Sequence, residues 1–203
     1  MNAPLTTVTG VAAPLQRANI DTDVIIRIER VAQFGKGELQ PYALETLRFG
    51  VDGTPDPGFI LNQAPFDAAV ILVAGENFGC GSSRENAVWA LADLGLRVVI
   101  APSFGDIFFS NCFQNGVLPI RLPQEVVTRI AATLTPQNPR LTVELERQVL
   151  VLNNGETVPF EVEPYRKAML ISGMDEIGLT LSRLTDIEAA EARDRQQRPW
   201  LYV

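Results

Sequence analysis

Three short apolar runs, separated by two helical patterns, constrain the fold of this chain more than any other feature. The runs are AAVILVAG (68–75), RVVIAP (97–102) and VLPIRL (117–122), and continuous apolar runs of this length are typical of strands covered on both faces. Residues 84–94 and 104–116 show the apolar spacing of helices. The order strand, helix, strand, helix, strand predicts a βαβαβ core with a parallel sheet.

The segment before this core, residues 1–64, has few clean periodic elements. Within it, NIDTDVIIRI predicts an Asx-rich turn at residues 19–23 that leads into a short β-branched strand. A long connection rich in glycine and proline follows, and loops of this length are uncommon unless they are functional or disordered. We therefore expect this segment to carry a strand and a functional loop.

The segment after the core predicts a different set of elements. An amphipathic helix should follow Pro123, and antiparallel hairpin strands should flank Asn154-Gly155. Two further helices are expected at residues 164–172 and 186–197. We therefore expect one mixed α/β domain, residues 1–203, arranged in three layers. Along the chain it divides into an N-terminal segment (1–64), the βαβαβ core (65–122) and a C-terminal segment (123–203).

The charge balance argues against nucleic acid as a partner. The formal net charge is −7 and the sequence pI is about 4.7, whereas affinity for nucleic acid depends on clustered Lys and Arg. The densest basic run, residues 193–198, is interrupted by other polar side chains and predicts a solvated helix face. Apolar runs fall far short of the roughly 20 residues of a membrane helix, and the first 15 residues do not resemble a secretory signal. We expect a cytoplasmic protein without nucleic-acid or membrane partners.

The residue types that are scarce exclude whole classes of chemistry. The chain has no histidine, which excludes a Ser-His-Asp triad, a Cys-His pair and an HExxH zinc site. Its two cysteines, Cys80 and Cys112, are too few to hold an iron–sulfur cluster through thiolates alone. We expect no metal site in this chain. We also expect Cys80 to be a packed residue and Cys112 to lie in the core.

The segment GENFGCGSSRE (75–85) lies between a predicted strand and a predicted helix, where ligands of open α/β sheets gather. It lacks the third glycine of a dinucleotide fingerprint, the lysine of a P-loop and the histidine partner of a nucleophile elbow. Ser82 and Glu85 fit a capping box in which Ser82 is the N-cap. The free amides of a helix start favour a bound anion, and the Arg84 guanidinium is unfavourable beside the helix dipole unless an anion lies before it. The loop therefore predicts a site for a small carboxylic acid.

Four segments carry a resemblance to a known family: ENFGCGSSRE, NIDTDVII upstream of it, and VVIAPSFGDIFFSNCFQNGVLPI and IGLTL downstream. With them the chain resembles the small subunit of 3-isopropylmalate dehydratase, a branch of the aconitase superfamily, over nearly its whole length. The resemblance implies a swivelling β/β/α domain that closes over a separate large subunit. It also implies that the large subunit holds a [4Fe–4S] cluster and that this chain is inactive alone.

The same resemblance implies roles for individual residues. Ser82 would be the general base that removes a proton beside a carboxylate, and Arg84 and the Ser83 hydroxyl would hold the carboxylate oxygens of a di-acid. Lys36 would be a further substrate-binding residue, and the iron of the partner's cluster would polarise the leaving hydroxyl group. Dehydration and rehydration would then convert 2-isopropylmalate to 3-isopropylmalate in leucine biosynthesis. Because serine is a poor base, its alkoxide needs stabilisation by helix-end amides and cationic neighbours.

Three positions depart from the family pattern and leave alternatives open. Arg27 stands where proline is usual, Lys36 is the nearest basic residue in a loop that usually reads Arg-Thr-Gly-Phe-Gly, and Asn86 stands where histidine is common. The substrate could be another substituted malate, of citramalate or dimethylmalate type, or the chain could be a non-catalytic carboxylate sensor. Lys36 has the alternative of a solvated loop charge. Asp21 and Asp23 have the alternative of local turn caps.

Overall fold

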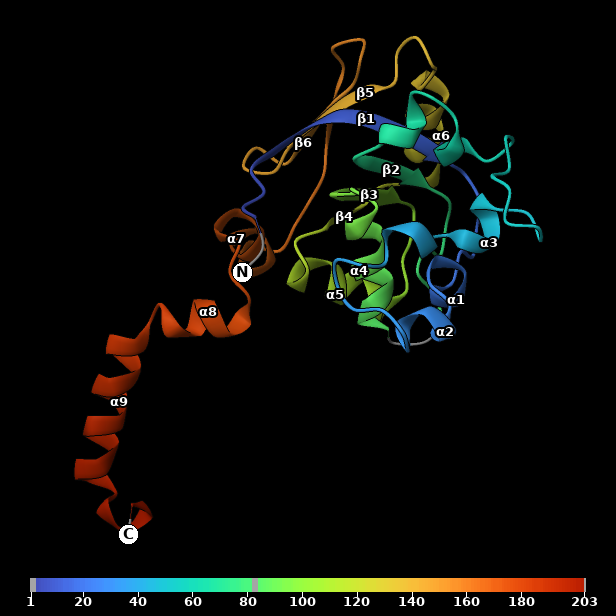
Figure 1. The fold of residues 1–203 in the computed structure, drawn as a ribbon. Coiled ribbons are helices and arrows are strands. Elements are labelled where there is room, and N and C mark those ends of the chain that lie inside the picture. Colours follow the sequence, from blue (N-terminus) through green and yellow to red (C-terminus); the bar gives the residue numbers. More distant parts are fainter. Residues whose placement is uncertain (1–2, 82–83, 203) are drawn as a thin grey trace.

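The structure, a computed structural model, describes residues 3–81 and 84–202. These residues form a seven-stranded mixed sheet with the strand order β4-β3-β2-β1-β5-β6-β7 (Figure 1). Strands β1 to β4 run parallel to one another, whereas β5, β6 and β7 extend the sheet in antiparallel pairs. The predicted α/β class is confirmed. The strands are β1 (Thr7–Leu15), β2 (Ile71–Ala74), β3 (Val98–Ala101), β4 (Leu118–Arg121), β5 (Arg140–Glu144), β6 (Val149–Val151) and β7 (Thr157–Pro159).

Two helices make the crossovers of the predicted βαβαβ core. α4 (Glu85–Asp93) connects β2 to β3, and α5 (Asp106–Gln114) connects β3 to β4. The predicted helix after Pro123 is α6 (Gln124–Thr133), and α7 (Pro164–Ser172) has the predicted bounds. The other helices are α1 (Thr22–Ile25), α2 (Ile28–Val31), α3 (Glu45–Arg48), α8 (Glu176–Leu181) and α9 (Leu184–Gln197), with 3-10 turns η1 (Gln40–Tyr42), η2 (Ile60–Asn62), η3 (Phe66–Ala68) and η4 (Pro199–Leu201).

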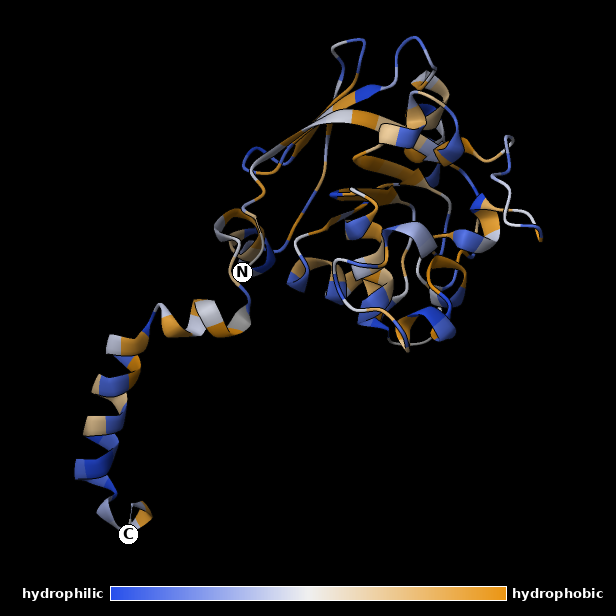
Figure 2. Ribbon diagram, viewed as in Figure 1, coloured by the Kyte–Doolittle hydropathy of each residue, from blue (hydrophilic) through white to orange (hydrophobic). Residues whose placement is uncertain are grey.

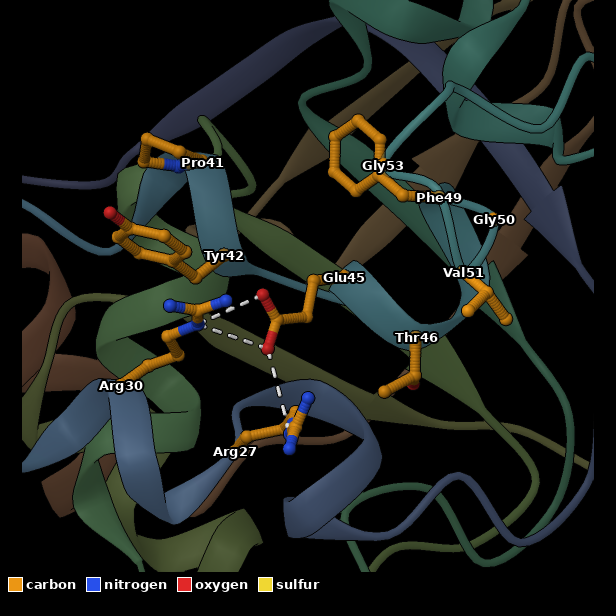
Figure 3. Close-up of a pocket in the computed structure, with 10 residues that line it drawn as sticks. All are labelled: Arg27, Arg30, Pro41, Tyr42, Glu45, Thr46, Phe49, Gly50, Val51 and Gly53. Carbon is orange, nitrogen blue, oxygen red and sulfur yellow. Dashed lines mark hydrogen bonds and ion pairs between the residues drawn. The ribbon is translucent and has the colours of Figure 1, made fainter.

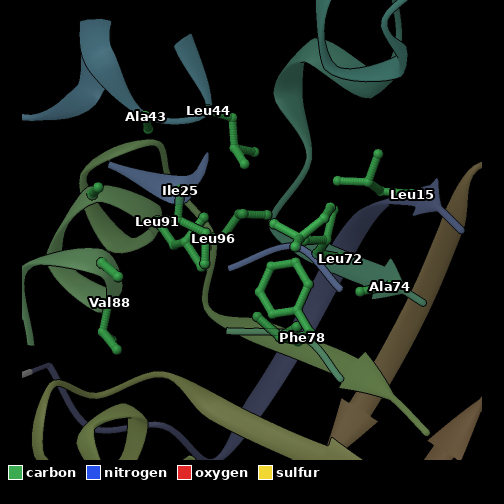
Figure 4. Close-up of a cluster of buried hydrophobic side chains, with 14 of the residues drawn as sticks. Leu15, Ile25, Ala43, Leu44, Leu72, Ala74, Phe78, Val88, Leu91 and Leu96 are labelled. Atoms are coloured by element: carbon green, nitrogen blue, oxygen red, sulfur yellow. The ribbon is translucent and has the colours of Figure 1, made fainter. Parts of the chain in front are cut away.

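The parallel strands are covered on both faces, which explains their continuous apolar runs. All four residues of β2 and of β3 are buried. In β2, Leu72 and Ala74 belong to one buried cluster, which also contains Phe78, Val88 and Leu91 and lies between the sheet and α4 (Figure 4). Because side chains alternate along a strand, the other residues of β2 face a second cluster on the opposite side.

The second cluster explains the three layers. It joins Ile71 and Val73 of β2 to Val143 of β5, Leu150 of β6 and Val127 of α6. The antiparallel half of the curled sheet therefore packs with the parallel half around a shared core, while α4 and α5 cover the outer face of the parallel half (Figure 1). This arrangement is the expected β/β/α order.

One expectation for the N-terminal segment is wrong. The predicted strand after the Asx-rich turn is helical instead, because residues 22–25 form α1 and residues 28–31 form α2. Asp21 is the N-cap of α1, and its Oδ1 accepts a hydrogen bond of 2.7 Å from the backbone N–H of Val24. This local cap, together with complete burial of Ile25, outweighs the β propensity of the branched side chains.

The central strand β1 is absent from the sequence-based expectations. It pairs with β2 on one side and with β5 on the other, so it joins the parallel half of the sheet to the antiparallel half. Its sequence, TVTGVAAPL, is rich in small residues and lacks the apolar bulk that marks β2 and β3. Ala12 and Ala13 are nonetheless fully buried. Small residues are needed here because both faces of β1 are packed.

The C-terminal helices are partly as predicted. α9 begins two residues before the predicted start at residue 186, and α8 was not expected. α9 extends away from the sheet (Figure 1) and is largely hydrophilic in Figure 2, which confirms the solvated face predicted for residues 193–198. Within the described ranges, no helix has both the length and the hydropathy that would be required to cross a bilayer.

Candidate functional site

The loop that follows β2 is held between two other loops at the carboxyl ends of the parallel strands. On one side, the Gly79 N–H donates to the Ile20 carbonyl at 2.7 Å, and the Thr22 N–H donates to the Cys80 carbonyl at 2.9 Å. On the other side, the Phe78 N–H donates to the Ser103 carbonyl at 3.0 Å. Segments that follow β1, β2 and β3 thus meet at one sheet edge, which is where α/β folds bind ligands.

Two glycines of this loop are required by close packing. A Cβ atom at Gly75 would lie 2.5 Å from the Arg17 carbonyl oxygen. A Cβ atom at Gly79 would lie 2.2 Å from Cγ of Phe108, and Gly79 also has a φ of +69°, which side chains disfavour. The loop therefore approaches its neighbours at distances that only glycine permits.

Aromatic side chains support the loop from below. Phe78 is fully buried and packs edge-to-face on Phe108, with the ring centroids 5.6 Å apart. Phe104 also meets Phe78 edge-on at 6.5 Å. Such pairs each add about 0.5–1.5 kcal/mol beyond the burial of their area. The segment before the two serines is therefore held in one conformation.

The predicted catalytic residue Ser82 and the predicted substrate-binding residue Ser83 lie outside the described residues. The capping box with Ser82 as N-cap is wrong, because the N-cap of α4 is Arg84. The Glu85 carboxylate, which a capping box would turn back toward Ser82, accepts a hydrogen bond of 2.9 Å from Nδ2 of Asn115. The Glu85 carboxylate is thus hydrogen-bonded to the residue that ends α5.

Arg84, the other predicted catalytic residue, stands at the start of α4 and forms an ion pair with Asp23 of α1 through Nη1 and Oδ1. The Arg84 side chain is 24% exposed and that of Asp23 is 58% exposed. The turn-cap alternative is thus correct for Asp21 but not for Asp23, whose carboxylate supplies the negative charge that Arg84 needs near a helix start. The guanidinium still has further N–H donors for a second carboxylate.

Lys36 is tied to the domain through Asn115. Its Nζ donates to Asn115 Oδ1 at 3.0 Å, and the residue is otherwise exposed, which agrees with the alternative of a solvated loop charge. The same oxygen accepts a hydrogen bond of 2.8 Å from Nε1 of Trp89. The loop is also fixed next to Lys36, because the Gly37 and Leu39 N–H groups both donate to Asp93 Oδ2. The loop of Lys36 is therefore attached to both ends of α4.

Asn115 was missed by the sequence analysis. It is 7% exposed, and both the oxygen and the nitrogen of its side-chain amide are used in the contacts above. In the sequence it stands before Gly116 at the end of a helix, where asparagine is an ordinary turn residue. The available signal was the neighbouring glycine, which marks a helix end but indicates nothing about three distant partners.

A cavity of about 640 Å³ lies beside Arg27 (Figure 3). Glu45 is at its centre and accepts hydrogen bonds of 3.0 and 3.2 Å from Arg30 Nε, while Arg27 Nε lies 3.7 Å away. Hydrogen bonding to Glu45 raises the pKa of Arg30 above its usual value. Arg27 has a φ of −72°, a value that proline also adopts. The lining residues are Arg27, Arg30, Pro41, Tyr42, Glu45, Thr46, Phe49, Gly50, Val51 and Gly53.

Metal ligands do not gather in the part of the chain that the structure describes. No group of three or more Cys, His, Asp or Glu side chains there could hold an ion. Cys112 is fully buried, as predicted, and burial raises the pKa of its thiol well above the usual value. Cys80, within the loop that follows β2, is partly exposed. The described residues therefore do not fit a [4Fe–4S] cluster.

Two family models match this chain. The aconitase C-terminal domain matches residues 2–125, and the C-terminal domain of the 3-isopropylmalate dehydratase small subunit matches residues 176–202. The chain belongs to the 3-isopropylmalate dehydratase small-subunit family of aconitase-type domains.

Similar proteins agree with this membership. The chain is 51% identical to the 3-isopropylmalate dehydratase small subunit of Rhodospirillum centenum, over 96% of this chain and 97% of that protein. It is 48% identical to that of a Ruegeria species, over 96% of this chain and 98% of that protein. The crystal structure of 3-isopropylmalate dehydratase from Methanocaldococcus jannaschii superposes with a TM-score of 0.65 at 25% identity, covering 91% of this chain and 99% of that one.

In this small-subunit family member, one predicted site residue, Arg84, lies at the start of α4. Arg84 stands directly before Glu85, and Glu85 is linked through Asn115 to Lys36. Ser82 and Ser83 are adjacent to Arg84 in the sequence. Lys36 and Glu85 are 49 positions apart in the sequence and are joined through the side chain of Asn115.

Proposed function

We propose that this chain is the small subunit of a two-chain hydro-lyase that isomerises 2-isopropylmalate to 3-isopropylmalate in leucine biosynthesis. Two observations support the proposal. About half of the residues are identical, over nearly the full length, to proteins named 3-isopropylmalate dehydratase small subunit. In addition, Arg84 lies at a helix start at the carboxyl ends of parallel strands. The required partner is the large subunit, in which we place the [4Fe–4S] cluster. This chain alone would then be inactive.

The proposed roles follow the chemistry of the reaction. Ser82 removes the proton from the carbon next to a carboxylate, and Arg84 with the Ser83 hydroxyl holds that carboxylate. Loss of this proton and of the hydroxyl group from the neighbouring carbon gives an alkene and water, and return of water with the opposite placement moves the hydroxyl by one carbon. The cluster of the large subunit would supply Lewis acidity toward the departing oxygen. Removing one well-placed charge-stabilising donor costs about 10²–10³ in turnover.

Lys36 enters the proposal in a less direct role. Its amino group is 3.0 Å from Asn115 Oδ1 and 5.8 Å from the centre of the Trp89 ring. We therefore propose that Lys36 orders the loop beside the site and contacts substrate only by leaving Asn115. Arg27 and Lys36 both lie in the loop region that departs from the family pattern, so another substituted malate is the second candidate substrate.

The experiment uses the full chain co-expressed with its large subunit. Turnover of 2-isopropylmalate, citramalate and dimethylmalate is measured for the wild type, Ser82→Ala, Arg84→Gln and a control, Ser110→Ala on α5. We expect the wild type to prefer the isopropyl compound and both site variants to lose at least about 10²-fold in kcat/KM while still co-purifying with the large subunit. The control should keep its activity.

Each contrary outcome has a defined meaning. Full turnover by Ser82→Ala would show that another group is the base. Preference for citramalate or dimethylmalate would assign the second candidate substrate. A pair that binds malates without converting any of them would favour the carboxylate-sensing alternative.

A further inference from the structure

The C-terminal arm, which we define as residues 176–202, contributes nothing to the two buried cores. It comprises α8, α9 and η4, and no residue of it belongs to either described cluster. α9 has no buried residue along its 14 positions. A cavity of about 550 Å³, lined by Tyr165 and Ala168 of α7 and by Ile187 of α9, lies where the arm leaves the domain. In Figure 1 the arm projects away from the sheet.

The arm nevertheless carries most of the exposed apolar bulk of the described chain. Six of the ten exposed large hydrophobic side chains in the described residues belong to it, although it spans 27 of 203 positions. Concentrated exposed apolar surface marks interaction sites, and an isolated helix of this length is only marginally stable in water. The six are Ile177 (70% exposed), Leu181 (57%), Leu184 (47%), Trp200 (68%), Leu201 (59%) and Tyr202 (46%).

These side chains form two groups at opposite ends of α9. Ile177 and Leu181 of α8 lie with Leu184 at the near end of α9, and Trp200, Leu201 and Tyr202 lie beyond its far end. The helix between them is largely hydrophilic (Figure 2) and spans about 21 Å at 1.5 Å per residue. A partner must therefore present two apolar contact areas separated by about that distance.

The family matches indicate which partner this is. The aconitase C-terminal domain, by its name, is one part of a longer chain, and its match ends at residue 125. The match to the family named for the small subunit spans residues 176–202, which are the bounds of the arm. A domain that is covalently joined to its partner is held near it at high effective concentration. A separate chain has no such link, so additional contacts must provide the free energy of association. The arm is thus the addition that a separate small subunit requires.

We propose that the arm docks on the large subunit and that the two apolar groups at the ends of α9 make the main contacts with that subunit. This inference rests on the proposed function only in requiring that a large subunit exists. Its 27 residues match the roughly 20–30 residues that one side of a standard interface uses. Tryptophan and tyrosine are the residue types most often responsible for interface affinity, so the Trp200 group should contribute most.

The test measures the affinity of the full chain for the purified large subunit by isothermal titration. The variants are Leu181→Asp in the inner group, Trp200→Asp in the outer group and Glu188→Gln on the polar surface of α9 as control. We expect a loss of at least about 30-fold in affinity for each of the first two and a change below about threefold for the control. Thermal unfolding of the three isolated variants should match the wild type, because these side chains lie outside the cores.

Turnover distinguishes this inference from the proposed function. At saturating large subunit, Leu181→Asp and Trp200→Asp should recover the wild-type kcat, since the site is intact, whereas Ser82→Ala should not. A wild-type pair that associates through the arm but converts no isopropylmalate would defeat the proposed function and leave the docking role standing. Unchanged affinity in both arm variants would overturn the docking role. So would a dimer of the isolated chain, seen by sedimentation equilibrium, that the variants abolish while large-subunit binding persists.

Discussion

Replacing Gly79 by alanine should destabilise the protein through two separable costs. The backbone cost arises because φ is +69°, and a left-handed conformation costs a residue with a side chain about 1–2 kcal/mol. The steric cost arises because the new Cβ would lie 2.2 Å from Cγ of Phe108, and overpacking of a core costs about 1–3 kcal/mol. The sum is about 2–5 kcal/mol, which corresponds to about 4–20 °C in the melting temperature of a chain of this size.

The chain offers a matched control for the backbone cost. Gly155 has a φ of +85°, and a Cβ atom there would meet nothing within 4 Å. Gly155→Ala should therefore cost only about 1–2 kcal/mol. The difference between the two variants, about 1–3 kcal/mol, measures the contact of Gly79 with Phe108.

A double-mutant cycle tests the assigned contact directly. Phe108→Ala removes the three ring atoms that would lie nearest to the added Cβ, so Gly79→Ala in that background should cost no more than Gly155→Ala. Urea unfolding followed by circular dichroism gives all four free energies of unfolding. The reasoning is refuted if Gly79→Ala costs no more than Gly155→Ala in the wild-type background, or if its cost is unchanged when Phe108 is absent.

Three further predictions follow from buried side chains. Asn115→Ala should lower the free energy of unfolding by about 1–3 kcal/mol, because it removes the partner of both the Trp89 N–H and the Glu85 carboxylate; an unchanged urea midpoint would contradict this. Burial raises the pKa of Cys112, so the unfolded thiol releases its proton first and stability should fall as pH rises above about 8.5; Cys112→Ala should remove that part of the slope between pH about 7.5 and about 9.5. Titration with a thiol reagent should modify Cys80 in the native protein and Cys112 only after unfolding, and rapid native labelling of both would show that Cys112 is accessible.

The parts of the fold that could be read from the sequence are those in which the local pattern and the tertiary environment agree. β2 and β3 are buried on both faces, so their residues are apolar throughout and the runs are visible. The hairpin around Asn154-Gly155 was visible because Gly155 adopts positive φ in its turn. In each case one short segment contains the whole signal.

The parts that could not be read depend on partners distant in the sequence. β1 contains small residues because both of its faces are packed, Ala13 against one buried cluster and Ala12 against the other, and the strands that pair with it come from residues 71–74 and 140–144. The link from Lys36 to Glu85 passes through Asn115, and none of these residues shows its partner in its own neighbourhood. The Arg84–Asp23 pair likewise joins two segments whose charges each had a local explanation. Polar pairing across a fold leaves no periodic signature in the sequence.

The Arg84–Asp23 pair also constrains how an acid can bind under the proposed function. Asp23 is 58% exposed, and exposed ion pairs contribute only about 0–1 kcal/mol, so exchanging this carboxylate for that of a substrate changes the free energy little. The pair still keeps the guanidinium directed across the start of α4 before substrate arrives, which lowers the ordering cost of binding. A substrate carboxylate would therefore meet an Arg84 guanidinium that is already positioned and is only weakly paired with Asp23. An arginine without a partner at a helix start would be repelled by the helix dipole and would have to be ordered by the substrate itself.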